Sequence, residues 1–207
     1  MFYFFENQDI IDELKKISDI LSETKVKIYP EIHNIFKAFI PLEKIKVVIL
    51  GQDPYHDGNA VGLCFSIYPK TKLNPSLRNI YNELEKEGYK INRNGNLSHW
   101  AKQGCFMLNT SLTVAKGLPN SHTDYWYKFT QKVIENICRR DNICWMLLGK
   151  NAINFKHNIT NNTHFIFCTS HPSPFSANRN ISNDIPAFLG SNIFNRVNEK
   201  LLEKIVW

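Results

Sequence analysis

A short polar segment, residues 51–56, carries residue types suited to hydrolytic chemistry. It reads Gly-Gln-Asp-Pro-Tyr-His after an apolar run, so a carboxylate, a phenol and an imidazole stand close together in the chain. The glycine permits a tight turn that exposes backbone N–H groups, and the proline stiffens the turn that presents Asp53. These features allow a catalytic constellation around Asp53. From spacing alone, an ordinary surface Asx-turn is the simpler interpretation.

A second segment, residues 171–176, follows the same logic. It reads His-Pro-Ser-Pro-Phe-Ser, and its alternating prolines predict a stiff, extended loop. The loop offers an imidazole at His171, hydroxyls at Ser173 and Ser176, and an aromatic ring at Phe175. Taken singly, a histidine or phenylalanine of this kind is usually structural. The presence of both segments in one chain favours a functional site.

Short apolar strands alternating with amphipathic helices are expected to position these segments. Strands are expected at residues 46–50, 106–109, 143–148 and 165–168. Helices are expected at residues 9–21, 32–39, 76–87, 125–139, 151–156 and 193–205. The alternation predicts an α/β fold: a single-domain, three-layer arrangement of residues 1–207 around a short central four-stranded parallel sheet flanked by helices.

A polar segment begins where each expected strand ends. Gly51, Asn109, Gly149 and His171 occupy these strand ends or follow them closely. Parallel sheets bind ligands in the crevice at the carboxyl ends of their strands. We therefore expect one cleft to collect the four positions.

The composition is that of a globular chain whose positive charge would suit a polyanionic partner. Of the 207 residues 43% are hydrophobic, the net charge is +6 and the sequence pI is about 9.0. These values favour nucleic acid as a partner without requiring it. No apolar run approaches the ~20 residues of a membrane helix, and the first residues lack the basic start of a secretion signal. A bacterial-type cytoplasm is the expected location, with a nucleus or organelle left open.

The cysteines are odd in number and widely spaced, without a Cys-x-x-Cys pair. They are Cys64, Cys105, Cys138, Cys144 and Cys168. This pattern argues against a disulfide framework, a metal site and an iron–sulfur cluster. No metal or other cofactor is expected.

Further short motifs extend the pattern of the two polar segments. They are Gly-Leu-Cys-Phe-Ser at 62–66, Pro-Ser-Leu at 75–77, Leu-Asn-Thr at 108–110 and Asn-Ser-His at 120–122. Together these segments resemble the family 1 uracil-DNA glycosylases, in order from about residue 28 to the end of the chain. The resemblance implies hydrolysis of the N-glycosidic bond of deoxyuridine in single- and double-stranded DNA, which releases free uracil and leaves an abasic site. The nucleotide is flipped out of the helix because the bond is unreachable in the stack.

Carried over position by position, the resemblance assigns roles to individual residues. Asp53 and His171 are the expected catalytic pair, with the carboxylate activating water and the imidazole bonding uracil O2. The uracil site is expected to combine this pair with Gln52, Tyr55, Phe65 and Asn109. The DNA contacts are expected at Ser76, Gly149, Lys150, Ser173 and Ser176, and at Phe175 as the wedge that enters the helix. Uracil-containing DNA is the implied substrate of an expected monomer, with a uracil-mimicking protein inhibitor and replication-fork proteins as further partners.

Elementary chemistry agrees with these assignments. Cleavage leaves an oxocarbenium ion on the sugar and a uracil anion, so an ionised Asp53 stabilises the first and a neutral His171 donates to the second. One carboxylate then suffices where ordinary sugar hydrolysis uses two. Asn109 offers the donor and acceptor that match uracil O4 and N3–H, and Tyr55 can exclude the methyl group of thymine.

Several positions depart from the family pattern. Phe175 stands where leucine is usual, and Lys150 follows Gly149 where serine is common. Lys150 is either a phosphate contact or a solvated lysine at a helix start, and both interpretations stay open. Residues 180–186 form an extra segment, expected as a surface loop beside the wedge. The alternative function is a catalytically silent homologue that binds DNA or assists replication, and an iron–sulfur uracil glycosylase would need clustered cysteines.

Overall fold

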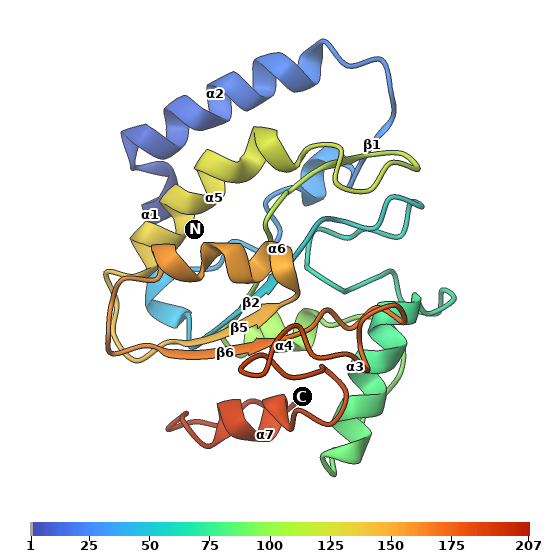
Figure 1. The fold of residues 1–207 in the computed structure, drawn as a ribbon. Helices are drawn as coiled ribbons and strands as arrows, with labels where there is room; N and C mark the ends of the chain where they lie inside the picture. Colours follow the sequence, from blue (N-terminus) through green and yellow to red (C-terminus); the bar gives the residue numbers. More distant parts are fainter. Residues whose placement is uncertain (1) are drawn as a thin grey trace.

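A four-stranded parallel sheet lies at the centre of the molecule (Figure 1). The computed structural model describes residues 2–207, and the strands of this sheet are β2 (Val47–Gly51), β3 (Cys105–Asn109), β5 (Cys144–Leu148) and β6 (Phe165–Thr169). Their order across the sheet is β3-β2-β5-β6, and all neighbouring strands are parallel. The predicted α/β class and the predicted parallel sheet are confirmed.

Helices cover both faces of the sheet, which explains why every residue of β2, β3 and β5 is buried. Figure 1 shows α5 (Thr123–Ile137) and α6 (Lys150–Ile153) on one side of it, with α4 (Ser98–Lys102) and α7 (Ile193–Asn198) on the other. α3 (Pro75–Lys86) contacts the beginning of α7. Its Glu83 side chain accepts the Asn192 N–H at 3.0 Å. The result is the three-layer arrangement that the alternation of strands and helices predicts.

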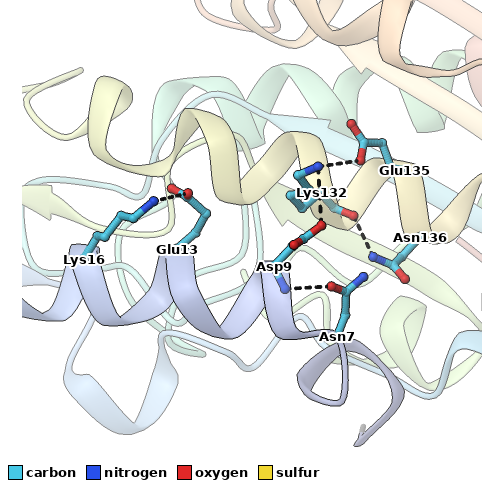
Figure 2. Close-up of polar contacts among 7 residues, drawn as sticks. All are labelled: Asn7, Asp9, Glu13, Lys16, Lys132, Glu135 and Asn136. Atoms are coloured by element: carbon cyan, nitrogen blue, oxygen red, sulfur yellow. Dashed lines mark hydrogen bonds and ion pairs between the residues drawn. The ribbon is translucent and has the colours of Figure 1, made fainter.

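α2 (Gln8–Ser22) forms an outer layer on α5. Ile10 is fully buried, and Asn7 caps the helix by accepting the Asp9 N–H at 3.0 Å. Figure 2 shows Lys132 of α5 reaching Asp9 across the helix pair, with 3.7 Å between the charged atoms. An exposed pair of this kind contributes about 0–1 kcal/mol, so apolar contacts dominate the docking of α2.

The expected helix at residues 32–39 is wrong. The chain forms a 3-10 turn, η1 (Ile32–Asn34), and then further tight turns in which the Phe39 N–H donates to the Phe36 carbonyl. A three-residue period places Phe36 and Phe39 on one side, and their ring centroids lie 5.7 Å apart. Packing of these rings into the core overrides the helical periodicity.

The expected helix at residues 193–205 is too long. α7 ends at Asn198, whose side-chain amide accepts the Ile205 N–H at 2.9 Å and donates to the Ile205 carbonyl at 3.0 Å. The chain therefore turns back on itself, and Trp207 packs with its ring centroid 5.0 Å from that of Phe194. The Asn198 side chain thus stabilises a folded-back segment where the sequence pattern predicts further helical turns.

Several short elements escape prediction because they are too short to show a period. They are α1 (Phe2–Phe5), α4, η2 (Leu42–Lys44) and the antiparallel pair of β1 (Ile28–Tyr29) with β4 (Val114–Ala115). The helix expected at residues 151–156 begins as α6 and continues as a 3-10 segment, η3 (Asn154–Asn158). None of the helices among residues 2–207 combines the length and apolar character needed to cross a membrane.

Candidate active site

The carboxyl ends of the strands bring the two polar segments to one edge of the sheet. Gly51 at the end of β2 pairs with Asn109 at the end of β3. Gly149 follows β5 and donates its N–H to the carbonyl of Thr169, the last residue of β6, at 3.0 Å. His171 comes two residues later in the chain. The four positions expected to share a cleft are thus neighbours.

Gly51 is a glycine because its neighbours leave no room for a side chain. A Cβ there would lie 2.7 Å from Oδ1 of Asn109 and 3.4 Å from the Phe65 ring. The loop after Gly51 is also pinned from β3, since the Thr110 hydroxyl donates to the Gln52 carbonyl at 2.7 Å. The absence of a side chain at Gly51 therefore lets Asn109 and Phe65 approach each other beside a fixed loop.

The Asp53 carboxylate is held by two donors. Oδ2 accepts the backbone N–H of Asn120 at 2.7 Å, and Oδ1 accepts the Gln52 side-chain amide at 3.2 Å. Burial raises the pKa of Asp53 above its ordinary value, although both hydrogen bonds and the charge of His56 act in the opposite direction. The carboxylate is therefore oriented in the site by its two donors.

His171 is held as a neutral imidazole with a defined tautomer. Burial disfavours the charged ring and lowers the pKa of His171 to about 4. Nδ1 accepts the backbone N–H of Ser173 at 3.0 Å, which places the single ring proton on Nε2. Gly149 allows the close approach of this histidine, because a Cβ there would lie 2.8 Å from the His171 Cβ. Nε2 of His171 is thus a hydrogen-bond donor.

Phe65 adopts a conformation that few side chains tolerate. Its φ is +62°, in the left-handed region, and its ring centroid lies 5.7 Å from that of His171. The Tyr55 hydroxyl donates to the Phe65 carbonyl at 3.3 Å, and burial raises the pKa of that hydroxyl. Left-handed backbone in a non-glycine residue costs about 1–3 kcal/mol and gathers at functional sites. Tyr55 and Phe65 are therefore locked together as two walls of the site.

Asn109 contributes a side-chain amide at the end of β3. The residue is 9% exposed, and its Oδ1 and the Phe65 ring both lie beside Gly51. A side-chain amide carries hydrogen-bond donors and an acceptor. Asn109 therefore presents both kinds of group next to Phe65.

The loop that carries His171 is braced internally and from α3. The Ser176 hydroxyl donates to the His171 carbonyl at 2.9 Å and lies 2.9 Å from the Ser173 hydroxyl. The Asn79 side chain on α3 donates to the Pro172 carbonyl at 2.8 Å. Ser76, half-buried, lies in the first turn of the same helix. The bracing leaves the Phe175 ring 87% exposed at the tip of a rigid loop.

Two further departures from the family pattern, besides Phe175, lie on the surface. Lys150, the first residue of α6, is exposed. Residues 180–186 form a closed turn in which the Ile181 N–H donates to the Ile185 carbonyl at 3.0 Å, and Asn180 accepts the Ala187 N–H at 2.8 Å. The sequence therefore places this segment correctly on the surface, after the loop that carries Phe175.

Sequence reasoning missed two contributors to the site. Residues 120–122 appeared only as part of a family motif, without a link from Asn120 to Asp53. Asn79 showed no signal, because it is one of several polar residues on a helix surface. Within residues 2–207, no three His, Cys, Asp or Glu side chains gather closely enough to hold a metal ion.

Comparison with known proteins places this geometry in a family. The chain matches the uracil DNA glycosylase superfamily over residues 38–202. The uracil-DNA glycosylase of Brevibacillus brevis is 47% identical over 190 residues, which cover 87% of this chain and 80% of the relative. This chain belongs to the uracil DNA glycosylase superfamily.

Solved structures agree with membership of the superfamily. The crystal structure of mimivirus uracil-DNA glycosylase has a TM-score of 0.89 at 28% identity, covering 100% of this chain and 85% of that one. A variant of the mimivirus protein in complex with UGI has a TM-score of 0.86 at 29% identity, covering 95% and 81%. The chain is therefore a DNA glycosylase, a hydrolase of the DNA-repair class.

Proposed function

We propose that the chain releases uracil from DNA by hydrolysis, with Asp53 and His171 as its catalytic residues. The observation that carries the proposal is an oriented carboxylate together with a neutral imidazole whose Nε2 donates. As the bond between the sugar C1′ and uracil N1 breaks, its electron pair leaves with uracil. The Asp53 carboxylate stabilises the cationic sugar and orients water, whose oxygen bonds to C1′ while one of its protons passes to that carboxylate. The N–H of His171 stabilises the negative charge on uracil O2.

Base recognition follows from the walls of the site. The Asn109 amide pairs with O4 and N3–H of uracil, and the Phe65 ring stacks on the base. Cytosine reverses both polar groups, and each mismatched buried pair costs roughly 1–3 kcal/mol. Gln52 supports Asp53 from its place in the same loop. Tyr55, tied to the Phe65 carbonyl, stands against C5 of the base.

Tyr55→Ala should admit thymine. Apolar contact alone discriminates a methyl group by only about 10–200-fold, so exclusion of thymine needs a rigid wall. We expect thymine release from a T·G duplex to rise at least about tenfold above the wild-type background. The assay is chromatographic detection of the free base. Tyr55→Phe is the matched control, because it keeps the ring and should still exclude thymine. Uracil release without any thymine release in Tyr55→Ala would contradict the assignment.

We propose that the surface around the site binds the DNA backbone. Ser76, Ser173, Ser176 and the backbone at Gly149 contact phosphates, and the exposed Lys150 adds a point charge. Binding of this kind weakens as salt rises, because phosphate contacts release counterions. The Phe175 ring enters the gap that the flipped nucleotide leaves.

Phe175→Ala should slow uracil release from duplex DNA far more than from single strands. Loss of one stacking ring costs about 1–3 kcal/mol, so we expect roughly a tenfold or greater loss on duplex. Only the duplex contains a stack to be refilled. The measurement is single-turnover release on matched oligonucleotides, with Phe175→Leu as the control that keeps an apolar wedge. An equal loss on both substrates would remove the wedge role.

The test of the proposed function is release of free uracil from an oligonucleotide that contains one deoxyuridine, with EDTA present. We expect release from single and double strands, and a strand that breaks only after alkali treatment, because no lysine lies in either polar segment to act as a lyase nucleophile. DNA binding without uracil release would favour the catalytically silent homologue instead.

The proposal also covers the protein's inhibitor, its domain organisation, its oligomeric state, its partners and its location. The UGI complex of the mimivirus variant supports a uracil-mimicking protein as an inhibitor. The main cluster of buried side chains includes residues of all four central strands, which supports a single domain. A monomeric state, replication-fork partners and a bacterial cytoplasmic location stay predictions.

A further inference from the structure

A chain of side-chain and backbone contacts links α6 to the proposed catalytic carboxylate. The Asn151 side chain on α6 donates to Oδ1 of Asn120 at 3.2 Å. The backbone N–H of Asn120 donates in turn to Oδ2 of Asp53 at 2.7 Å. Asn151 directly follows Lys150 and comes two residues after Gly149. One residue therefore connects a proposed phosphate-contacting segment with Asp53.

Asn120 needs support to keep its N–H aimed at Asp53. Its φ is +65°, a left-handed conformation that asparagine tolerates better than most residues. Its carbonyl accepts the Thr123 N–H at 3.2 Å and the Thr123 hydroxyl at 3.0 Å. These bonds hold the C-terminal side of Asn120, and Asn151 holds its side chain. We therefore expect removal of the Asn151 amide to free the Asn120 side chain and to loosen the peptide that carries the N–H.

We propose that Asn151 is a positioning residue, which aims the Asn120 backbone N–H at Asp53 and links α6 to that carboxylate. This inference rests on the proposed function, since Asp53 must be the catalytic carboxylate for the link to affect the rate. Asn151 touches neither the base nor the reacting sugar in this proposal.

The experiment compares wild type with Asn151→Ala in single-turnover uracil release at saturating enzyme. We expect the rate to fall about two- to tenfold, the value of one modest hydrogen bond, while the concentration for half-saturation changes little. Asn154, which directly follows the last residue of α6, is exposed. Asn154→Ala is therefore the matched control and should keep the wild-type rate.

The pH profile supplies a readout that a merely structural role would leave unchanged. Asn120 stabilises the ionised form of Asp53, so a looser contact raises the pKa of Asp53 further. The acidic limb of the rate should then move to higher pH in Asn151→Ala. His56 is the other titratable group whose charge acts on Asp53, and the substitution does not alter it.

Asn120→Gly separates this link from general loosening. Glycine keeps the backbone N–H and permits the positive φ, but it removes the side chain that Asn151 contacts. In that background Asn151→Ala should have no further effect on the rate, and Asn151→Gln in the wild-type background should restore part of it. The inference would be overturned if Asn151→Ala kept the wild-type rate and the wild-type acidic limb. It would also be overturned if the substitution changed only the enzyme concentration for half-saturation and left the rate at saturation unchanged. Absence of uracil release from the wild-type protein would instead overturn the proposed function.

Discussion

Asp53→Asn is expected to lower the single-turnover rate of uracil release by about two to three orders of magnitude, while the protein stays folded and binds DNA. The reason is electrostatic, because asparagine carries no charge to stabilise the oxocarbenium-like sugar. The substitution is nearly isosteric, and its amide oxygen can still accept the Asn120 N–H. Loss of rate with unchanged thermal stability and unchanged DNA affinity is therefore the expected combination.

The pH profile tests the same carboxylate independently. Burial raises the pKa of Asp53 above the ordinary 3.8, so the active, ionised form is lost at a higher pH than for an exposed aspartate. The wild-type rate should fall on the acidic side with a midpoint above 3.8. The residual rate of Asp53→Asn should lack this limb. A wild-type rate in Asp53→Asn would remove Asp53 from the mechanism.

His171→Leu is the second substitution with a large expected effect. Loss of one preorganised donor to a developing oxyanion typically costs about 10²–10³ in rate. Leucine fills similar space without an N–H, so we expect a fall of that size in single-turnover release. His171→Gln is the matched variant, because its amide places an N–H near the former Nε2 and should restore part of the rate.

The protonation state of His171 can be measured directly. Because burial lowers its pKa to about 4, the ring should stay neutral from pH 8 down to about pH 5 in NMR titration. The direction of this pKa shift also predicts how the stability of the fold changes with pH. The unfolded histidine takes up a proton near pH 6.5, whereas the folded ring does so near 4, so this group destabilises the fold as pH falls between those values. His171→Gln should lose less stability than wild type over that interval. A ring that titrates near 6.5 in the folded protein would contradict the neutral-imidazole mechanism.

The central sheet and the order of the polar segments could be predicted from the sequence because both are local properties. β2 is an apolar run of five residues that ends at Gly51, and glycine and proline mark the turn that follows. The expected helix at residues 32–39 failed because its periodicity reports burial of Phe36 and Phe39 without deciding between helix and 3-10 turns. The helix expected at 193–205 failed because Asn198 bonds a segment that no local pattern ties to it.

The sequence by itself therefore determined the strands, the turns at their ends and the residue types that meet there. The tertiary structure alone decided how the reactive groups are held. The backbone donor to Asp53 comes from Asn120, 67 residues away, and its direction depends on a left-handed backbone conformation at that residue. The tautomer of His171 depends on the turn that brings the Ser173 N–H to Nδ1. The physical reason is that hydrogen-bond direction follows from backbone angles and loop closure, whereas sequence patterns report mainly which side chains are buried.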